Sequence, residues 1–76
     1  MIQRTETKTV IDHYETGKLA RSERLAAGLI VRQVAAEMGT GVAYIYDLEM
    51  GRRNWNERLI SAYSAAVKSA KKKAGK

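Results

Sequence analysis

Apolar side chains in the middle of the chain recur at the three- and four-residue spacing of an α-helix. The first such run, "VRQVAAEM", would place four apolar residues on one side of a helix: Val31, Val34, Ala35 and Met38. The second, "VAYIYDLEM", would carry Val42, Ile45 and Leu48, with Glu49 at its edge. Helices this short are marginal in water by themselves. Both runs are therefore predicted to pack against other parts of the chain.

Two further helical runs flank this pair and can cover its apolar side. The earlier one starts at about Gly17, and "GKLARSERLAAG" places on one face Ala20, Arg24 and Ala27. The later one, "ERLISAYSAAVKSA", carries an apolar stripe of Leu59, Ile60, Tyr63, Ala66 and Val67. Asn56 precedes it as a predicted N-cap, because an Asn side chain accepts a hydrogen bond from the first turn. Abundant alanine and the absence of proline predict an all-α fold of four helices.

The two short runs are joined by "MGTG", which predicts a tight turn between two crossing helices. Gly39 can adopt the left-handed conformation that ends a helix. Ala35 is small enough to let two backbones approach, while Ile45 and Leu48 are spaced to reach back to the same core. This spacing is typical of a helix-turn-helix, whose second helix can enter the major groove of DNA.

The stretches "RLAAGL", "VAAEMG" and "YIYDLEMGRRNW" together resemble the Cro and lambda-repressor (Xre-like) family of helix-turn-helix domains, especially its small phage or mobile-element members. The resemblance covers about Lys18 to Val67. It implies a compact four-helix domain of the lambda-repressor type, with five helices as the alternative, that binds double-stranded DNA. It also implies a structural ion pair between Arg24 and Glu49, which would join the first helix to the end of the third.

The formal net charge of the chain is +6, from 14 Lys and Arg against 8 Asp and Glu. Five of the lysines lie in the last nine residues, so residues 1–67 are nearly neutral. We divide the chain into an N-terminal arm (1–16), a helix-turn-helix domain (17–67) and a basic tail (68–76). The arm could be disordered, a short edge strand or an early helical turn. The tail could hold phosphates without reading sequence, or it could be a solvated end.

The composition argues against several classes of protein. The chain has no cysteine and a single histidine, His13, so neither a metal site nor a cofactor is predicted. It has no apolar run of the length that spans a membrane and no signal-peptide pattern, and the lack of cysteine suits a cytoplasmic location. An enzyme is not expected, because no pair of carboxylates or nucleophile with a base stands out.

If the second short helix lies in the major groove, its outward positions contact bases. These positions are Gly41, Val42, Ala43, Tyr44, Tyr46 and Asp47, followed by Met50. Further predicted DNA contacts are Arg32 and Gln33 at the start of the preceding helix, and Arg52, Arg53 and Asn54 in the following loop. Family members often carry amides and guanidinium groups at the outward positions, because these match base edges. Here Val42 and Ala43 could contact thymine methyl groups, and Asp47 could instead pair with a nearby arginine.

The leading interpretation is a sequence-specific transcriptional regulator, in the first instance a repressor, that binds DNA as a homodimer. Dimer contacts are expected from the fourth helix, with Tyr63 as an anchor, or from apolar residues of the N-terminal arm. Trp55 is expected in the core. The alternative is a protein-interaction module on the same fold, such as an antitoxin, an antirepressor partner or a subunit of a DNA-processing complex. It would use an apolar patch of Ile30, Val31, Val42, Ala43 and Tyr46.

Overall fold

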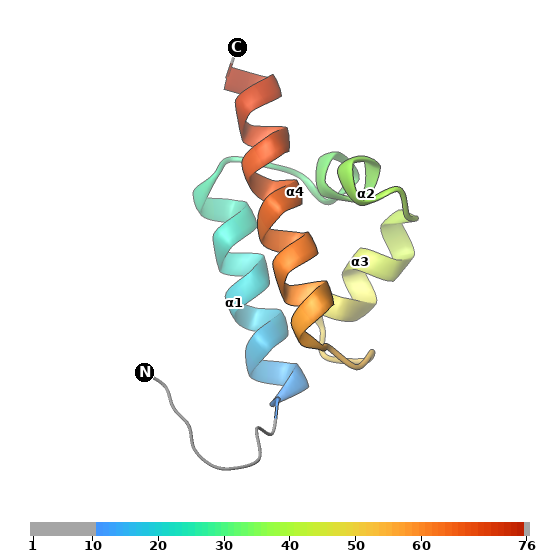
Figure 1. The fold of residues 1–76 in the computed structure, drawn as a ribbon. Helices are drawn as coiled ribbons and strands as arrows, with labels where there is room; N and C mark the ends of the chain where they lie inside the picture. The colour runs from blue at the N-terminus through green and yellow to red at the C-terminus, as the bar shows by residue number, and fades with distance from the viewer. Residues whose placement is uncertain (1–10, 76) are drawn as a thin grey trace.

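The computed structural model describes residues 11–75, and these fold as four helices. The helices are α1 (His13–Ala26), α2 (Val31–Met38), α3 (Val42–Glu49) and α4 (Glu57–Gly75). The described residues contain no strand, so the predicted all-α class with four helices is confirmed. In Figure 1, α1 and α4 lie side by side, and the short pair α2 and α3 lies to one side of them. Residues 1–10 of the predicted arm lie outside the described residues.

Helix α1 begins earlier than the sequence analysis placed it. Asp12 is its N-cap, and the Asp12 carboxylate accepts a hydrogen bond of 3.0 Å from the backbone N–H of Glu15. An aspartate at this position satisfies a donor that the helix itself leaves without a partner. The helix therefore begins four residues before the predicted start at about Gly17, which lies inside it, and residues 13–16 of the arm form the early helical turn that was one of its alternatives.

Helix α4 continues through most of the predicted basic tail. Ala70 is buried, so the apolar stripe extends one turn beyond Val67. The Glu37 carboxylate of α2 accepts hydrogen bonds from Ser69 Oγ (2.8 Å) and Lys73 Nζ (2.7 Å). These two hydrogen bonds, that from Lys73 first, lower the pKa of Glu37. The last turns of α4 are therefore attached to α2, and the boundary drawn at residue 67 does not coincide with the end of a structural element.

The turn between α2 and α3 is the one that the glycines predict. Gly39 ends α2 with a φ of 70°, in the left-handed region where glycine is favoured. Thr40 then donates its backbone N–H to the carbonyl of Ala35, which closes the turn. Because the chain reverses within residues 39–41, α3 crosses α2 instead of extending it (Figure 1).

The core lies where the four helices meet, and the predicted apolar stripes supply most of it. Its buried apolar residues are Ala20, Leu29, Val31, Val34, Ala35, Ile45, Leu48, Trp55, Tyr63, Ala66, Val67 and Ala70. Trp55 is buried as expected, and its indole N–H donates to the carbonyl of Leu48 at 2.9 Å. Its ring meets the Tyr63 ring edge-on, with centroids 5.7 Å apart. Asn56 caps α4 as predicted, because its side-chain oxygen accepts the Leu59 N–H.

Gly17 allows α1 to touch the end of α3. A Cβ atom at Gly17 would lie 2.5 Å from the Leu48 carbonyl oxygen and 2.6 Å from that of Glu49. Both obstacles are backbone atoms of a packed helix, which cannot move aside as a flexible side chain would. The glycine therefore sets the distance between α1 and α3.

We predict that Gly17→Ala destabilises the protein even though alanine is the better helix former. The gain in helix propensity is about 1 kcal/mol, whereas forcing extra volume into a close-packed contact costs about 1–3 kcal/mol, and a backbone obstacle puts this site at the upper end. A melting temperature lowered by at least about 5 °C is expected. Ser22→Ala, at an exposed position of the same helix, is the control and should be neutral or slightly stabilising. A Gly17→Ala variant as stable as the parent would contradict the close approach.

Candidate nucleic-acid interface

A buried ion pair holds α3 against α1. The Arg24 guanidinium donates to both oxygens of Glu49, from Nε at 2.8 Å and from the second terminal nitrogen at 3.0 Å. The side chains are 8 % and 2 % exposed, so both charges are removed from water. The ion pair that the resemblance implied is therefore present in the structure, with two-pronged geometry.

Two further groups complete the network around this pair. The remaining Arg24 nitrogen donates to the carbonyl of Leu29 at 2.9 Å, and the Tyr63 hydroxyl donates to Glu49 at 2.6 Å. The hydrogen bond to Glu49 raises the pKa of Arg24. Burial first, and then the hydrogen bond to Glu49, raise the pKa of Tyr63 above its ordinary range. Tyr63 is only 1 % exposed, so its predicted role as a dimer anchor was wrong, since its ring and hydroxyl are both used inside the domain.

The network leaves the opposite side of α3 facing solvent. Glu49 turns inward with Ile45 and Leu48. The outward side carries Gly41, Val42, Ala43, Tyr46 and Met50, all exposed, with Tyr44 and Asp47 half-buried. Tyr46 is 53 % exposed and Met50 55 %, large fractions for apolar and aromatic side chains. Of the α3 positions predicted to face DNA, Val42, Ala43, Tyr46 and Met50 thus lie on the exposed side, whereas Tyr44 packs against the core.

The loop after α3 brings two guanidinium groups to one edge of this face. Arg52 and Arg53 lie 3.8 Å and 3.7 Å from the Asp47 carboxylate. The Arg53 guanidinium also lies over the Tyr44 ring, 4.8 Å from its centroid, in a cation–π arrangement. Both arginine side chains are more than half exposed, so these contacts orient them while leaving donors available. Asp47 thus has the arginine partners proposed as its alternative role, and Asn54 beside them is exposed.

The start of α2 differs from a simple phosphate-binding terminus. The Gln33 side-chain oxygen accepts the backbone N–H of Ile30 at 2.8 Å, so Gln33 caps α2 itself. Arg32 is exposed and remains a candidate contact. Ile30 is 54 % exposed, whereas Val31 is only 4 % exposed. Val31 therefore belongs to the core, and its predicted place in an exposed apolar patch was wrong.

One site residue was missed by sequence reasoning. His13 Nδ1 accepts a hydrogen bond of 2.8 Å from the backbone N–H of Trp55. This bond ties the first turn of α1 to the segment that carries Arg52 and Arg53. The two residues are far apart in the sequence, and a lone histidine carries no local pattern that would reveal such a bond.

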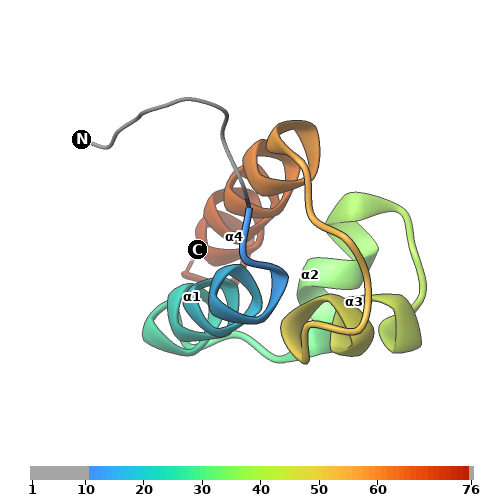
Figure 2. The same cartoon turned by 90° about the horizontal axis from the view of Figure 1, so that it is seen from below.

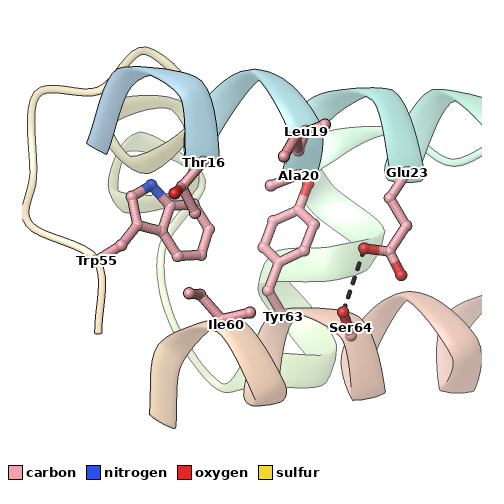
Figure 3. A pocket seen from close by; sticks show the side chains of 8 residues that line it. All are labelled: Thr16, Leu19, Ala20, Glu23, Trp55, Ile60, Tyr63 and Ser64. Carbon is pink, nitrogen blue, oxygen red and sulfur yellow. Dashed lines mark hydrogen bonds between the residues drawn. The ribbon is translucent and has the colours of Figure 1, made fainter. Parts of the chain in front are cut away.

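A hollow of about 190 Å³ lies between α1 and α4, away from α3 (Figure 3). Trp55 and Tyr63 form part of its wall, and Ser64 Oγ donates to Glu23 at 3.2 Å on its rim. Leu19 and Ile60 lie beside it with exposed fractions of 69 % and 37 %. This second exposed apolar region is separate from the outward side of α3.

Over residues 11–75, no helix is long and apolar enough to cross a membrane. The same residues contain no cluster of three or more His, Cys, Asp or Glu side chains that could hold a metal ion.

Comparison of the chain with family models, with curated proteins and with solved structures finds no match. The resemblance to the Cro and lambda-repressor family therefore stays a prediction that rests on the residues quoted above.

We predict that Arg24→Ala unfolds the domain or nearly so. Removing one partner of a buried pair leaves an uncompensated charge and costs about 3–5 kcal/mol, while a domain of this size has only a few kcal/mol of net stability. Urea titration followed by circular dichroism measures the loss. Arg58→Ala removes an exposed arginine from α4 and should change stability by less than about 0.5 kcal/mol. Equal stabilities of the two variants would refute the structural role of the pair.

We predict that Tyr63→Phe keeps the packing of the ring but removes about 1.5–3 kcal/mol of stability at neutral pH, because Glu49 loses a donor. The raised pKa of Tyr63 means that the folded chain keeps this proton to higher pH than the unfolded chain. Stability of the parent should therefore fall as pH rises above about 10. Tyr63→Phe should show a shallower alkaline decline in denaturation experiments, and an unchanged decline would contradict this assignment.

Proposed function

We propose that the chain is a sequence-specific regulator of transcription, acting as a repressor, that places α3 in the major groove of double-stranded DNA as a homodimer. The observation that carries the proposal is the exposed outward side of α3 with two arginines at its edge. An exposed helix that follows a tight turn from a supporting helix has the form needed to enter the groove. We also propose that the protein acts in the cytoplasm, where it would meet DNA.

The residues on the outward side of α3 and at its edge would have two roles: some bind the DNA backbone and position the protein, and others contact the bases. Arg52 and Arg53 would bind phosphates, which fixes the register of the protein on the duplex but carries no sequence information. Val42 and Ala43 offer methyl groups for thymine, and the hydroxyl of Tyr46 can donate to or accept from a base edge. A single face of this kind discriminates weakly, which favours a dimer reading two half-sites about one helical turn apart. Leu19 and Ile60 beside the α1–α4 hollow replace Tyr63 as candidate dimer contacts.

A second candidate function is a protein-interaction module, and one observation favours it. The outward side of α3 and the start of α2 expose several large apolar side chains, with Ile30, Val42, Tyr46 and Met50 between 38 % and 55 % exposed. Exposed apolar patches commonly mark protein-binding surfaces. The arginines beside the face favour DNA, since a protein partner would not need two cations that keep free donors.

The two functions are separated by binding to duplex DNA across a series of salt concentrations. A pool of random duplexes of about 20 base pairs, long enough for two half-sites, is selected on the protein, and the enriched duplex is compared with the starting pool. A sequence-specific regulator should prefer the enriched duplex by at least about 1,000-fold, with affinity falling steeply as salt rises. No preference at any salt concentration would overturn the proposal in favour of the protein-interaction module.

Two variants test the roles within the face. Tyr46→Ala should reduce the preference for the enriched duplex by about tenfold, since one base contact is worth about 1–3 kcal/mol. Arg52→Ala with Arg53→Ala should weaken the enriched and the random duplex alike and lower the salt slope by about 2. Tyr46 is a better probe than Tyr44, because Tyr44 is half-buried and packs against the core. A Tyr46→Ala variant that weakens both duplexes alike, or an arginine variant that weakens only the enriched duplex, would contradict the division of roles.

A further inference from the structure

Helix α1 carries two cations next to the exposed face of α3. Lys18 and Arg21 line a groove between the helices together with Tyr46 and Met50, and the groove has a volume of about 440 Å³. Figure 2 shows that α1 and α3 lie next to each other. Both cationic side chains are exposed to solvent. The groove therefore combines positive charge with the aromatic and apolar side chains that α3 presents.

These cations lie on the opposite flank of α3 from the loop arginines. Tyr46 and Met50 are four positions apart along α3 and therefore lie on the same side of that helix. This side borders α1, because both residues line the groove with Lys18 and Arg21. Asp47 and Tyr44 lie about a quarter turn or more further round, and it is these that Arg53 contacts. The outward face of α3 is thus bordered by positive charge along both of its edges.

The position of α1 beside α3 is fixed by three close contacts. Gly17 packs against the last carbonyls of α3, and the buried pair of Arg24 and Glu49 joins the two helices further along. Gly51, with a φ of 80°, brings the loop against Tyr14, because a Cβ there would lie 2.9 Å from the Tyr14 Cα. The cations of α1 are therefore attached to a backbone that keeps its distance from α3.

A helix in the major groove has a phosphate strand on each side of it, since the groove is about 12 Å wide and is bounded by both backbones. We propose that α1 is a second phosphate-binding edge, in which Lys18 and Arg21 contact one strand while Arg52 and Arg53 contact the other. This inference rests on the proposed function and extends it to a helix outside the helix-turn-helix pair. In this arrangement α3 is held between two rows of charge-assisted hydrogen bonds.

The acidic groups near this edge leave its charge available. Glu15 approaches Lys18 at 3.9 Å, with both side chains more than half exposed, and such surface pairs are weak. Lys18 also lies over the Tyr14 ring, 5.3 Å from its centroid. Glu49 lines the groove but is neutralised by Arg24. Within residues 11–75, Arg21 has no carboxylate within 4 Å.

The lysines of α4 provide a matched control. They belong to the C-terminal part of α4, whereas Arg52 and Arg53 lie in the loop that leads into its N-terminal end. At a rise of 1.5 Å per residue, Lys68 and Lys71 lie roughly 17 Å and 21 Å along α4 from its first residue, Glu57. Lys68 and Lys71 are both exposed, so removing them changes the net charge as much as removing Lys18 and Arg21 does. In the proposed arrangement these two lysines belong to the solvated end, one of the two roles left open for the basic tail, and contact no phosphate.

The test measures binding to the enriched duplex and to the random pool between low and high salt. Lys18→Ala with Arg21→Ala should weaken binding to both duplexes about equally. It should also make the slope of log affinity against log salt less steep by about 2, one for each phosphate contact. Lys68→Ala with Lys71→Ala should leave the slope within about 0.5 of the parent. Lys18→Arg with Arg21→Lys keeps both charges and should restore most of the slope. Circular dichroism melting checks that every variant is folded, and Lys18→Gln with Arg21→Gln serves as a second charge-removing pair.

The outcomes separate this inference from the function on which it rests. If the parent binds no duplex with preference, the proposed function fails and this inference fails with it. If the parent binds and the slope falls for the loop arginines but not for the pair on α1, the inference alone is overturned. A slope that falls equally for the pair on α1 and the pair on α4 would overturn it as well, because only net charge would then matter.

Discussion

The structure depends on the buried ion pair of Arg24 and Glu49, in which each charge is stable in the interior only because the other is beside it. Arg24 comes from α1 and Glu49 from the end of α3, while the network reaches α4 through Tyr63 and the entry to α2 through the carbonyl of Leu29. Three helices and the segment that leads into α2 thus meet at one buried carboxylate and one buried guanidinium. An isolated charge in this interior would be strongly unfavourable. Each element is therefore needed, because each supplies a charge or a hydrogen-bonding group to the network. Glu49 turns inward with Ile45 and Leu48, so the opposite side of α3 faces solvent.

Much of this arrangement could be predicted from the sequence, because it follows from local pattern. The apolar stripes, the turn at Gly39 and the cap at Asn56 each rest on residues within one or two turns of each other. The misinterpreted positions depend on contacts between distant segments. Gly17 resembles a helix start until α3 is placed against it, and Tyr63 resembles a surface anchor until Glu49 lies beneath its hydroxyl. The exposed face of α3 belongs to the first kind, whereas the position of the α1 cations beside it depends on how α1 packs against α3.

The candidate interface has a mixed character that follows from its residues. Most DNA-reading helices present amide and guanidinium groups to base edges, whereas α3 presents small apolar and aromatic side chains and keeps its cations at the borders. Such a surface would take affinity from phosphates and selectivity from shape and methyl contacts. The same apolar centre also suits a protein partner, which is why binding to duplex DNA separates the two functions better than any single contact.

The hydrogen bond from the Trp55 backbone to His13 has a practical consequence. It makes the beginning of α1 a support for the arginine-bearing loop, although the two are distant in sequence. A truncation or fusion that displaces residues 12 and 13 would therefore disturb the loop as well as the N-terminus. Trp55 is the only tryptophan of the chain, so its intrinsic fluorescence offers a built-in optical reporter of whether an engineered N-terminus has left that support intact.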